Sequence, residues 1–280
     1  YAVEVSHLRH VFNPGLPFES VAVDDVSFRI KKESFAAVIG HTGSGKSTLI
    51  QHLNGLLKPA LSSVCINASD INSGQIKLKD VRRRVGLVFQ YPEYQLFEET
   101  VLKDVCYGPL NLGMTQEQAQ QKAKRAIELV GLDFEEIKDR SPFALSGGQK
   151  RRVAIAGVIA MEPEVLILDE PTAGLDPKSH RDILLMIEKI KRENHITILL
   201  VSHNMGDVAR LADQVLVMDG PPQQVFARAE ELSEIGLGLP PATGFMLLLQ
   251  RMGAPVETSA LTMQEAFAEI IKWKRGEKRC

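Results

Sequence analysis

Short apolar runs rich in β-branched residues alternate along this chain with segments whose apolar residues recur every three or four positions. The first pattern is typical of buried strands and the second of amphipathic helices. Strands that alternate with helices predict an α/β domain built on a mostly parallel sheet. The candidate strands are Ser34–Ile39, Val85–Phe89, Val165–Leu168, Ile196–Val201 and Gln214–Met218.

Helical patterns follow most of these strands. Capping boxes predict two helix starts, at Thr115 with Gln118 and at Thr262 with Glu265. A third helix is expected to begin near Pro177, since proline suits the first helical position. The helix after the first strand is expected to end at Pro59 and to carry four leucines on one face: Leu49, Leu53, Leu56 and Leu57.

The pattern also divides the chain into regions. Residues 91–162 are rich in helical pattern and poor in strand pattern, so we expect a helical subdomain inserted into an α/β domain that covers residues 1–220. Residues 221–280 contain chain-breaking glycines and prolines and two helical patterns, which predict a small C-terminal helical extension. The link Asp219–Pro222 between these parts is unusually abrupt.

Composition excludes some classes of protein. The 280 residues include 33 Lys and Arg against 35 Asp and Glu, and the net charge of -2 argues against a nucleic-acid binder. No apolar run approaches the roughly 20 residues of a membrane span, so membrane association is expected to be peripheral, through a partner. Cys65, Cys106 and Cys280 have no metal-ligand spacing and indicate reduced thiols.

A glycine-rich segment follows the first predicted strand and precedes a predicted helix. Its glycines let backbone N–H groups converge on phosphate oxygens, and the helix presents its partially positive N-terminus to the same anion. Lys46 can reach the β- and γ-phosphates, and the Ser47 hydroxyl can bind Mg²⁺. The alternative is a glycine-rich turn without a ligand. The motif and the threonine after it comprise Gly40, His41, Thr42, Gly43, Ser44, Gly45, Lys46, Ser47 and Thr48.

Polar residues follow three of the other predicted strands. Asp169 ends the strand Val165–Leu168 and suits the Mg²⁺ site of a phosphate-loop enzyme, while Glu170 would orient or deprotonate an attacking water. Gln90 could bridge Mg²⁺ and that water, and His203 could contact the γ-phosphate. Taken singly, each of these residues could equally be structural or solvent-exposed.

The segment Leu145, Ser146, Gly147, Gly148 and Gln149 is absent from most phosphate-loop NTPases. Together with the preceding motifs it resembles the ABC ATPases, over roughly residues 1–220. The resemblance implies an ATPase with ATP and Mg²⁺ bound, in which this segment closes over the γ-phosphate held by the opposite subunit of a head-to-tail dimer. Asp176 would lie in a loop crossing the interface. Phe12 stands where the family often stacks an aromatic ring on adenine, although it could also be a packing residue.

Three longer matches are similar to the energy-coupling factor transporter ATPases, and the third is similar to the second of their two ATPase types. They are the segments Val88–Val101, Arg151–Gly157 and Pro171–Pro177, and the short segment Gly40–Gly43 is similar to the same family. This resemblance implies a motor subunit for uptake of a vitamin or of a transition-metal ion, at the cytoplasmic face of the membrane. Its implied partners are a second ABC ATPase, forming a heterodimer, a transmembrane coupling protein and a membrane protein that binds the substrate.

Other functions remain open at this point. A soluble ABC protein acting on DNA or ribosomes would usually carry two cassettes or a long coiled-coil insertion. A kinase or GTPase would lack Leu145–Gln149, and no guanine-reading motif is evident. A binding module without hydrolysis would not need Lys46, Asp169, Glu170 and His203 together.

Overall fold

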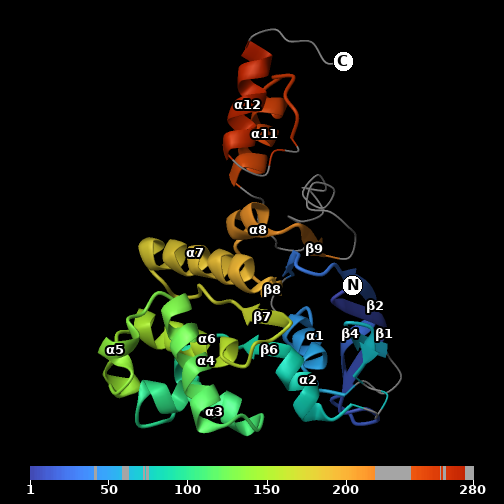
Figure 1. Cartoon of the computed structure of the whole chain (residues 1–280). Coiled ribbons are helices and arrows are strands. Elements are labelled where there is room, and N and C mark those ends of the chain that lie inside the picture. Colours follow the sequence, from blue (N-terminus) through green and yellow to red (C-terminus); the bar gives the residue numbers. More distant parts are fainter. Residues whose placement is uncertain are drawn as a thin grey trace. The chain divides into compact units, whose positions relative to one another are not determined.

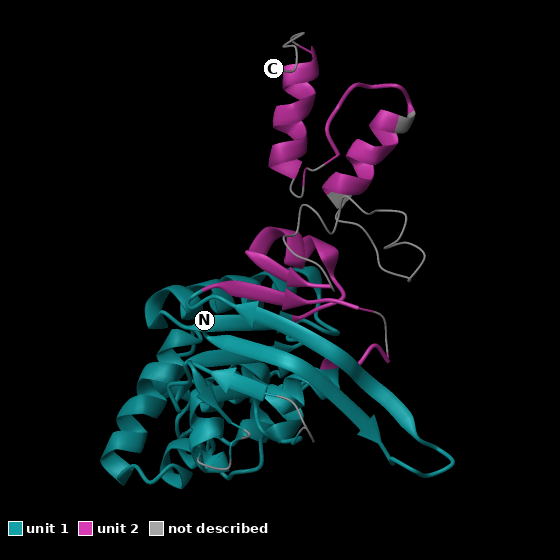
Figure 2. Ribbon diagram, turned by 90° about the vertical axis from the view of Figure 1, so that its right-hand side faces the viewer, with its two compact units in different colours: residues 1–33, 47–200 teal, residues 34–46, 201–280 magenta. Residues whose placement is uncertain are grey.

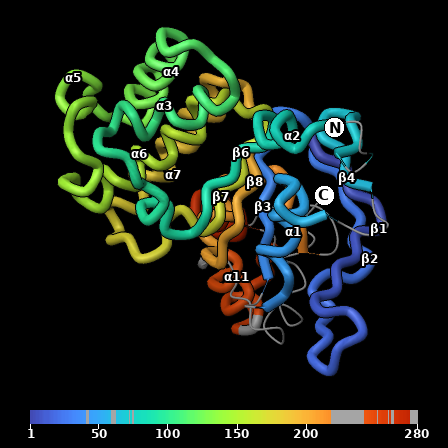
Figure 3. The backbone as a smooth tube through the Cα atoms, turned by 90° about the horizontal axis from the view of Figure 1, so that it is seen from below, coloured from blue at the N-terminus to red at the C-terminus, as the bar shows by residue number. Residues whose placement is uncertain are grey.

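The computed structural model of the chain describes residues 1–40, 43–58, 63–71, 73, 76–217, 241–258, 260 and 263–274. The chain divides into two compact units (Figure 2). Unit 1 comprises residues 1–33 and 47–200, and unit 2 comprises residues 34–46 and 201–280. In unit 1 the inserted helices gather at one end and the antiparallel strands at the other (Figures 1 and 3).

All five predicted strands are present. In unit 1, β6 (Val85–Val88) pairs in parallel with β7 (Val165–Asp169), and β8 (Thr197–Val201) lies next to β7. In unit 2, β3 (Phe35–Val38) pairs in parallel with β9 (Gln214–Leu216). Nearly all residues of these strands except those of β9 are buried, which is why they read as continuous apolar runs.

An antiparallel sheet in unit 1 was not among the predicted strands. Its strands lie in the order β2-β1-β4-β5, with β1 Val3–Phe12, β2 Ser20–Ile30, β4 Ser63–Ile66 and β5 Ser69–Asp70. Register shifts interrupt the β1–β2 pairing after Val5, Leu8 and His10, and His7 has a positive φ of 52°. Such bulges break the two-residue alternation from which a half-buried strand is predicted.

Helices fill the chain between β6 and β7, within the region predicted to be helical. The capping box at Thr115 is confirmed, and it opens a helix whose buried face includes Ala119, Ala123 and Ile127. The elements are η1 Pro92–Gln95, α3 Val101–Asn111, α4 Gln116–Leu129, α5 Phe134–Ile137, η2 Pro142–Ala144 and α6 Gly147–Ile159. The flanking helices of unit 1 are α2 Leu78–Arg84 and α7 Pro177–Asn194, and α7 begins at the predicted proline.

The helix after the glycine-rich segment is shorter than predicted. Helix α1 spans Lys46–Leu53 and ends before the last two leucines of the predicted apolar face. Gly55 adopts φ 70°, in the left-handed region, and reverses the chain. The N–H groups of Leu56 and Leu57 both donate to the Gln51 carbonyl, and the Leu56 side chain is 44% exposed. Leu56 and Leu57 therefore belong to a turn, and Pro59 lies outside the described residues.

Unit 2 contains two small apolar clusters. Helix α8 (Met205–Leu211) packs with β3 and β9 around Ala37, Val208 and Val215. Farther along the chain, α11 (Pro241–Arg251) and α12 (Met263–Lys274) pack around Met246, Val256 and Ala266. Thr262 of the predicted capping box and the link Asp219–Pro222 lie outside the described residues. In the part of the chain that the structure describes, every helix is too short or too polar to cross a bilayer.

Candidate ATPase site

The glycine-rich loop follows the buried strand β3 and runs into α1. A Cβ atom on Gly40 would lie 2.6 Å from Ser44 Oγ, so any larger residue at this position would require the Ser44 side chain to move. Gly43 and Gly45 have φ values of 85° and 87°, which favour glycine. Lys46 Nζ donates to the Gly40 carbonyl at 2.7 Å, across the loop. His41 and Thr42 lie outside the described residues, and Ser47 is exposed whereas Thr48 is buried.

Gln90 and Glu170 meet in unit 1 because of the register of two strands. Val88 of β6 lies opposite Leu168 of β7, and each polar residue comes two positions later. Gln90 Nε2 donates to Glu170 Oε2 at 3.3 Å. Asp169 is the last residue of β7 and directly precedes Glu170. It lies at the same carboxyl edge of the strands, where parallel sheets bind their ligands. Parallel pairing thus brings an amide and two acidic residues to one edge.

Glu170 has an unusual backbone. Its φ is 46°, in the left-handed region that a residue with a long side chain rarely adopts. Such conformations cost on the order of 1–3 kcal/mol and cluster at functional sites, where the surrounding structure holds them. The chain reverses sharply here, so the Glu170 carboxylate leaves the strand in a direction that a regular continuation of β7 would not allow.

Helix α6 begins with two glycines, of which Gly147 is exposed and Gly148 half-buried. Ser146 caps the helix and forms a capping box with Gln149, while Leu145 is buried below. Gly147 and Gly148 do not have positive φ, and an added Cβ at either would meet no atom within 4 Å in the described chain. Neither the backbone nor the packing of this chain therefore requires glycine at these two positions. Glycine there suits the close approach of a molecule from outside.

Asp176 lies in the loop between β7 and α7. Its Oδ1 accepts hydrogen bonds from the N–H groups of Lys178 and Ser179, at 3.0 and 3.1 Å, and caps α7. Hydrogen bonds from Ser179, with a further one from Lys178, lower the pKa of the Asp176 carboxyl below its usual range. The residue is therefore an ionised helix cap at neutral pH.

Phe12 and His203 lie apart from these groups in the sequence. Phe12 ends β1 with its side chain 42% exposed, and its ring stands edge-on to His10 at 4.5 Å. His10 in turn contacts the buried His52 of α1, at 4.8 Å between ring centroids. Burial and the neighbouring His10 lower the pKa of His52 to about 4, so this imidazole is neutral at pH 7. His203 comes two residues after the end of β8; it belongs to unit 2, and its side chain is exposed.

A family model described as ABC transporter matches residues 23–173. The energy-coupling factor transporter ATP-binding protein EcfA2 of Clostridium tetani is 52% identical to this chain, and the match covers 97% of the chain and 96% of that protein. The protein with the same description from Caldanaerobacter subterraneus is 50% identical, with 99% of both covered. The chain belongs to the ABC transporter family, among the energy-coupling factor transporter ATP-binding proteins. As a member of this group, it binds ATP and hydrolyses it to drive transport.

Solved structures of ABC proteins have the same fold. A structure of cbiO1 from Clostridium perfringens, described as part of the ABC transporter complex cbiONQ, has a TM-score of 0.72 and 34% identity, with 90% of this chain and 97% of that chain covered. A dimeric ATP-binding cassette in a post-hydrolysis state, bound to ADP and Pi, has a TM-score of 0.66 and 28% identity, covering 76% and 92%. The predicted α/β phosphate-loop fold is therefore confirmed.

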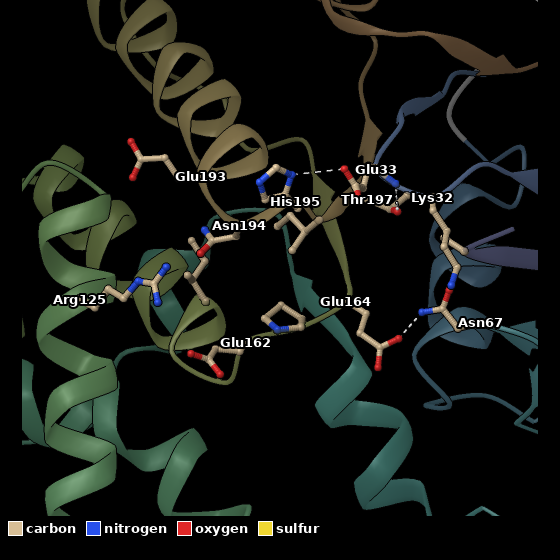
Figure 4. Close-up of a pocket in the computed structure, with 14 residues that line it drawn as sticks. Lys32, Glu33, Asn67, Arg125, Glu162, Glu164, Glu193, Asn194, His195 and Thr197 are labelled. Carbon is tan, nitrogen blue, oxygen red and sulfur yellow. Dashed lines mark hydrogen bonds and ion pairs between the residues drawn. The ribbon is translucent and has the colours of Figure 1, made fainter.

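One cavity of unit 1 is separate from the ABC motifs. It has a volume of about 470 Å³ and contains none of the predicted site residues (Figure 4). His195 Nδ1 lies 3.3 Å from a Glu33 carboxylate oxygen, and Asn67 donates to Glu164. Glu162 pairs with Lys122. Most acidic side chains of the cavity thus form hydrogen bonds or ion pairs with neighbouring residues. We therefore interpret the cavity as a solvated polar surface.

Arg151 was not singled out as a site residue in the sequence. Arg151 is 2% exposed and pairs with Glu93 between two of the motif-bearing segments. The available signal was that Arg151 stands in helical register with Ile155 and Ile159, because a charge on an apolar, buried helix face requires a partner.

Proposed function

We propose that this chain powers an energy-coupling factor importer for a vitamin or a transition-metal ion. Its partners would be a second, different ABC ATPase, a transmembrane coupling protein and a substrate-binding membrane protein, with no nucleic acid involved. It would bind them at the cytoplasmic face of the membrane. The similarity to relatives described as energy-coupling factor transporter ATP-binding proteins supports this, since it extends over nearly the full length of the chain. Residues 1–220 would form the ATPase domain, with its helical subdomain at 91–162, and residues 221–280 an extension.

In the proposed nucleotide site, the loop Gly40–Lys46 surrounds the phosphates and Phe12 stacks on adenine. Ser47, Gln90 and Asp169 would hold Mg²⁺, because hydroxyl, amide and carboxylate oxygens suit this ion. Gln90 fits, since its Nε2 donates to Glu170 and its Oε1 is left as the metal-binding group. The bound ion would neutralise charge on the β- and γ-phosphates.

The hydrogen bond between Gln90 and Glu170 is the observation that carries the proposed hydrolytic mechanism. Glu170 would accept a proton from the attacking water and orient it toward the γ-phosphorus. Gln90 would fix that carboxylate at 3.3 Å, and His203 would contact the γ-phosphate. Positioning and charge stabilisation account for most phosphoryl-transfer catalysis, so a preset pair of this kind suits the reaction.

We further propose that Leu145, Ser146, Gly147, Gly148 and Gln149 contact the ATP of the opposite subunit, with Asp176 near the same interface. The open space beside Gly147 and Gly148 supports this role, since an approaching phosphate could reach the helix N-terminus directly. The α6 helix is long enough, at 13 residues, to present a substantial dipole. Asp176 would contribute by keeping α7 capped at the loop that reaches the interface.

Replacement of Lys46 by alanine tests the phosphate loop. We expect ATP affinity to fall on the order of 10- to 100-fold, because a hydrogen bond to a charged group contributes about 1.5–3 kcal/mol. Equilibrium titration of the full chain with a fluorescent ATP analogue measures this. Lys58→Ala, at an exposed position, is the control and should bind normally. Unchanged affinity of Lys46→Ala would place the phosphates elsewhere.

A groove in unit 1 is the proposed docking site for the membrane partner. Its volume is about 540 Å³, and Leu56, Phe97 and Tyr107 line it with side chains 44–56% exposed. The Phe97 and Tyr107 rings pack edge to face at 4.8 Å. Apolar groups exposed together mark interaction surfaces. The lining contains residues of β6, α3, α6 and the linker after Gln90, which joins the groove to the proposed catalytic residues.

The double variant Glu98→Lys with Glu99→Lys tests this docking surface. The two residues directly follow Phe97, and Glu99 forms an exposed ion pair with Lys103 at 2.6 Å. Exposed pairs contribute about 0–1 kcal/mol, so the variant should fold and keep near-normal basal ATPase. We expect it to lose assembly with the membrane partners, measured by copurification of the complex.

Glu135→Lys with Glu136→Lys is the matched control. It makes the same change in charge at two adjacent residues of α5 and removes their ion pairs with Lys138 and Arg140. This control should assemble normally. If both double variants assemble, the docking surface lies elsewhere; if neither does, the loss follows from charge alone.

A further inference from the structure

Arg151 is a buried cation at the junction of three segments of unit 1. It lies on α6 and is 2% exposed. Its Nε and Nη2 donate to the two carboxylate oxygens of Glu93, at 3.0 and 2.8 Å. Its Nη1 donates to the carbonyls of Pro171 and Ala173, at 3.1 and 2.9 Å. All three guanidinium nitrogens therefore have acceptors, which a buried arginine requires.

Each of the contacted segments carries a residue of the proposed mechanism. Glu93 lies three positions after Gln90, and Pro171 directly follows Glu170. Arg151 itself lies in the second turn of the helix that Ser146 caps. One guanidinium thus joins the linker after Gln90, the loop after Glu170 and the helix that would contact the opposite subunit's ATP.

The surrounding contacts restrict movement at this junction. The Tyr91 ring centroid lies 6.0 Å from the Arg151 guanidinium carbon, in reach of a cation–π interaction. The Tyr91 ring also lies 3.7 Å from where a Cβ on Gly174 would be. Burial favours the protonated form of Glu93, but the hydrogen bonds and charge of Arg151 outweigh it and lower the pKa of Glu93. The pair is therefore ionised at neutral pH.

The linker after Gln90 contacts both this junction and the groove. Tyr91 and buried Pro92 are absent from the groove lining, whereas Leu96 and Phe97 of the same linker line it. The linker therefore has two ends with different contacts. Its first residues are held by Arg151, and its later residues face the groove.

We propose that Arg151 is a positioning residue of the ATPase, which holds the Glu170 loop and the Gln90 linker in fixed register with the helix α6. This inference rests on the roles proposed above for Gln90 and Glu170. Through this junction, a shift of the linker at the groove moves the backbone that follows Glu170, because the Glu93 carboxylate and the Pro171 carbonyl bind the same side chain. Occupancy of the groove and the position of the proposed general base are thereby coupled.

Arg151→Lys, compared with Arg152→Lys, tests the positioning role in the assembled transporter. A lysine keeps the charge but cannot hold Glu93 and both carbonyls in one fork. Arg152 is the matched control, since its Nη1 donates to the Val130 carbonyl and ties α6 to α4, away from the motifs. We expect Arg151→Lys to lower kcat on the order of 10- to 100-fold with KM for ATP changed less than about threefold, because small misplacements of reacting groups have effects of this size. Arg152→Lys should keep its kcat.

Glu93→Gln alone tests the same role if Arg151→Lys is poorly folded, because it should lower kcat with KM for ATP little changed. If Arg151→Lys folds, a double-mutant cycle of the two adds to the test. Glu93→Gln retains side-chain volume and the Arg151 bonds to both carbonyls. We expect its effect on kcat to be non-additive with Arg151→Lys and additive with Arg152→Lys. The inference is overturned if Arg151→Lys and Arg152→Lys reduce kcat equally, or if Glu93→Gln adds fully to Arg151→Lys. The turnover of Glu170→Gln is measured in the same assays. Normal turnover in that variant contradicts the proposed mechanism itself. If Glu170→Gln loses turnover but the two arginine variants reduce kcat equally, only the positioning role is contradicted.

Discussion

Replacement of Glu170 by glutamine is expected to lower ATP turnover on the order of 10²–10⁴-fold while ATP still binds. An amide cannot accept the proton of the attacking water, and general-base catalysis contributes an effect of this size. The side chain keeps its size and its position beside Gln90, so the loss should be in kcat. Steady-state hydrolysis and nucleotide titration of the assembled transporter measure the two quantities separately.

Glu162→Gln provides the control for this result. Glu162 lines the polar cavity, its carboxylate pairs with Lys122, and its φ is also positive, at 53°. The control removes a paired carboxylate at a left-handed position without touching the proposed mechanism, so turnover should remain normal. Turnover by Glu170→Gln near that of the unmodified chain would exclude Glu170 as the base.

Ser146→Arg combined with a lysine change is expected to show which subunit completes each ATP site. In the head-to-tail arrangement, Ser146→Arg damages the site whose phosphate loop belongs to the second ATPase. Removing that loop's lysine should therefore add nothing to Ser146→Arg, because both changes affect one site. Placing Ser146→Arg and Lys46→Ala in the same chain should damage both sites and reduce turnover to background. ATPase assays of the mixed assemblies distinguish the two combinations.

Ser146→Ala separates steric blockage from loss of the helix cap. It removes the same hydroxyl that accepts from the Gln149 N–H, at a cost of about 1 kcal/mol of stability, but adds no bulk. It should retain most turnover. Equal damage from the two lysine combinations would contradict the head-to-tail arrangement, whatever the result for alanine.

The parallel strands could be predicted because burial on both faces leaves an apolar run that no polar position interrupts. Strands β1 and β2 escaped prediction because each has exposed and buried positions whose alternation shifts at bulges, as between Val5 and Leu8. Helix α1 was extended too far because Leu56 and Leu57 continue its apolar spacing, whereas the left-handed Gly55 decides where it ends. Periodicity reports which residues are apolar, and a single backbone reversal can override it.

The motif residues could be found because their chemistry is local in the sequence. The bond between Gln90 and Glu170 follows from strand order once the register is known. The Arg151 junction could not be found in this way, since Glu93 and Pro171 are brought to it only by tertiary packing across 58 and 20 residues. Sequence patterns thus predict which groups act on ATP more readily than which groups hold them.

Gly147 and Gly148 affect the stability of the single chain and the activity of the assembly in opposite directions. Glycine in a helix is less stabilising than alanine by roughly 0.5–1 kcal/mol, and neither residue has a steric reason within its own subunit. In the proposed arrangement, the stability is lost in one polypeptide and the catalytic gain appears at a nucleotide bound by another. Selection on this turn would then act on the pair of ATPases as a unit, and the two proteins would be constrained to change together at the surface where Gly147 and Gly148 leave room.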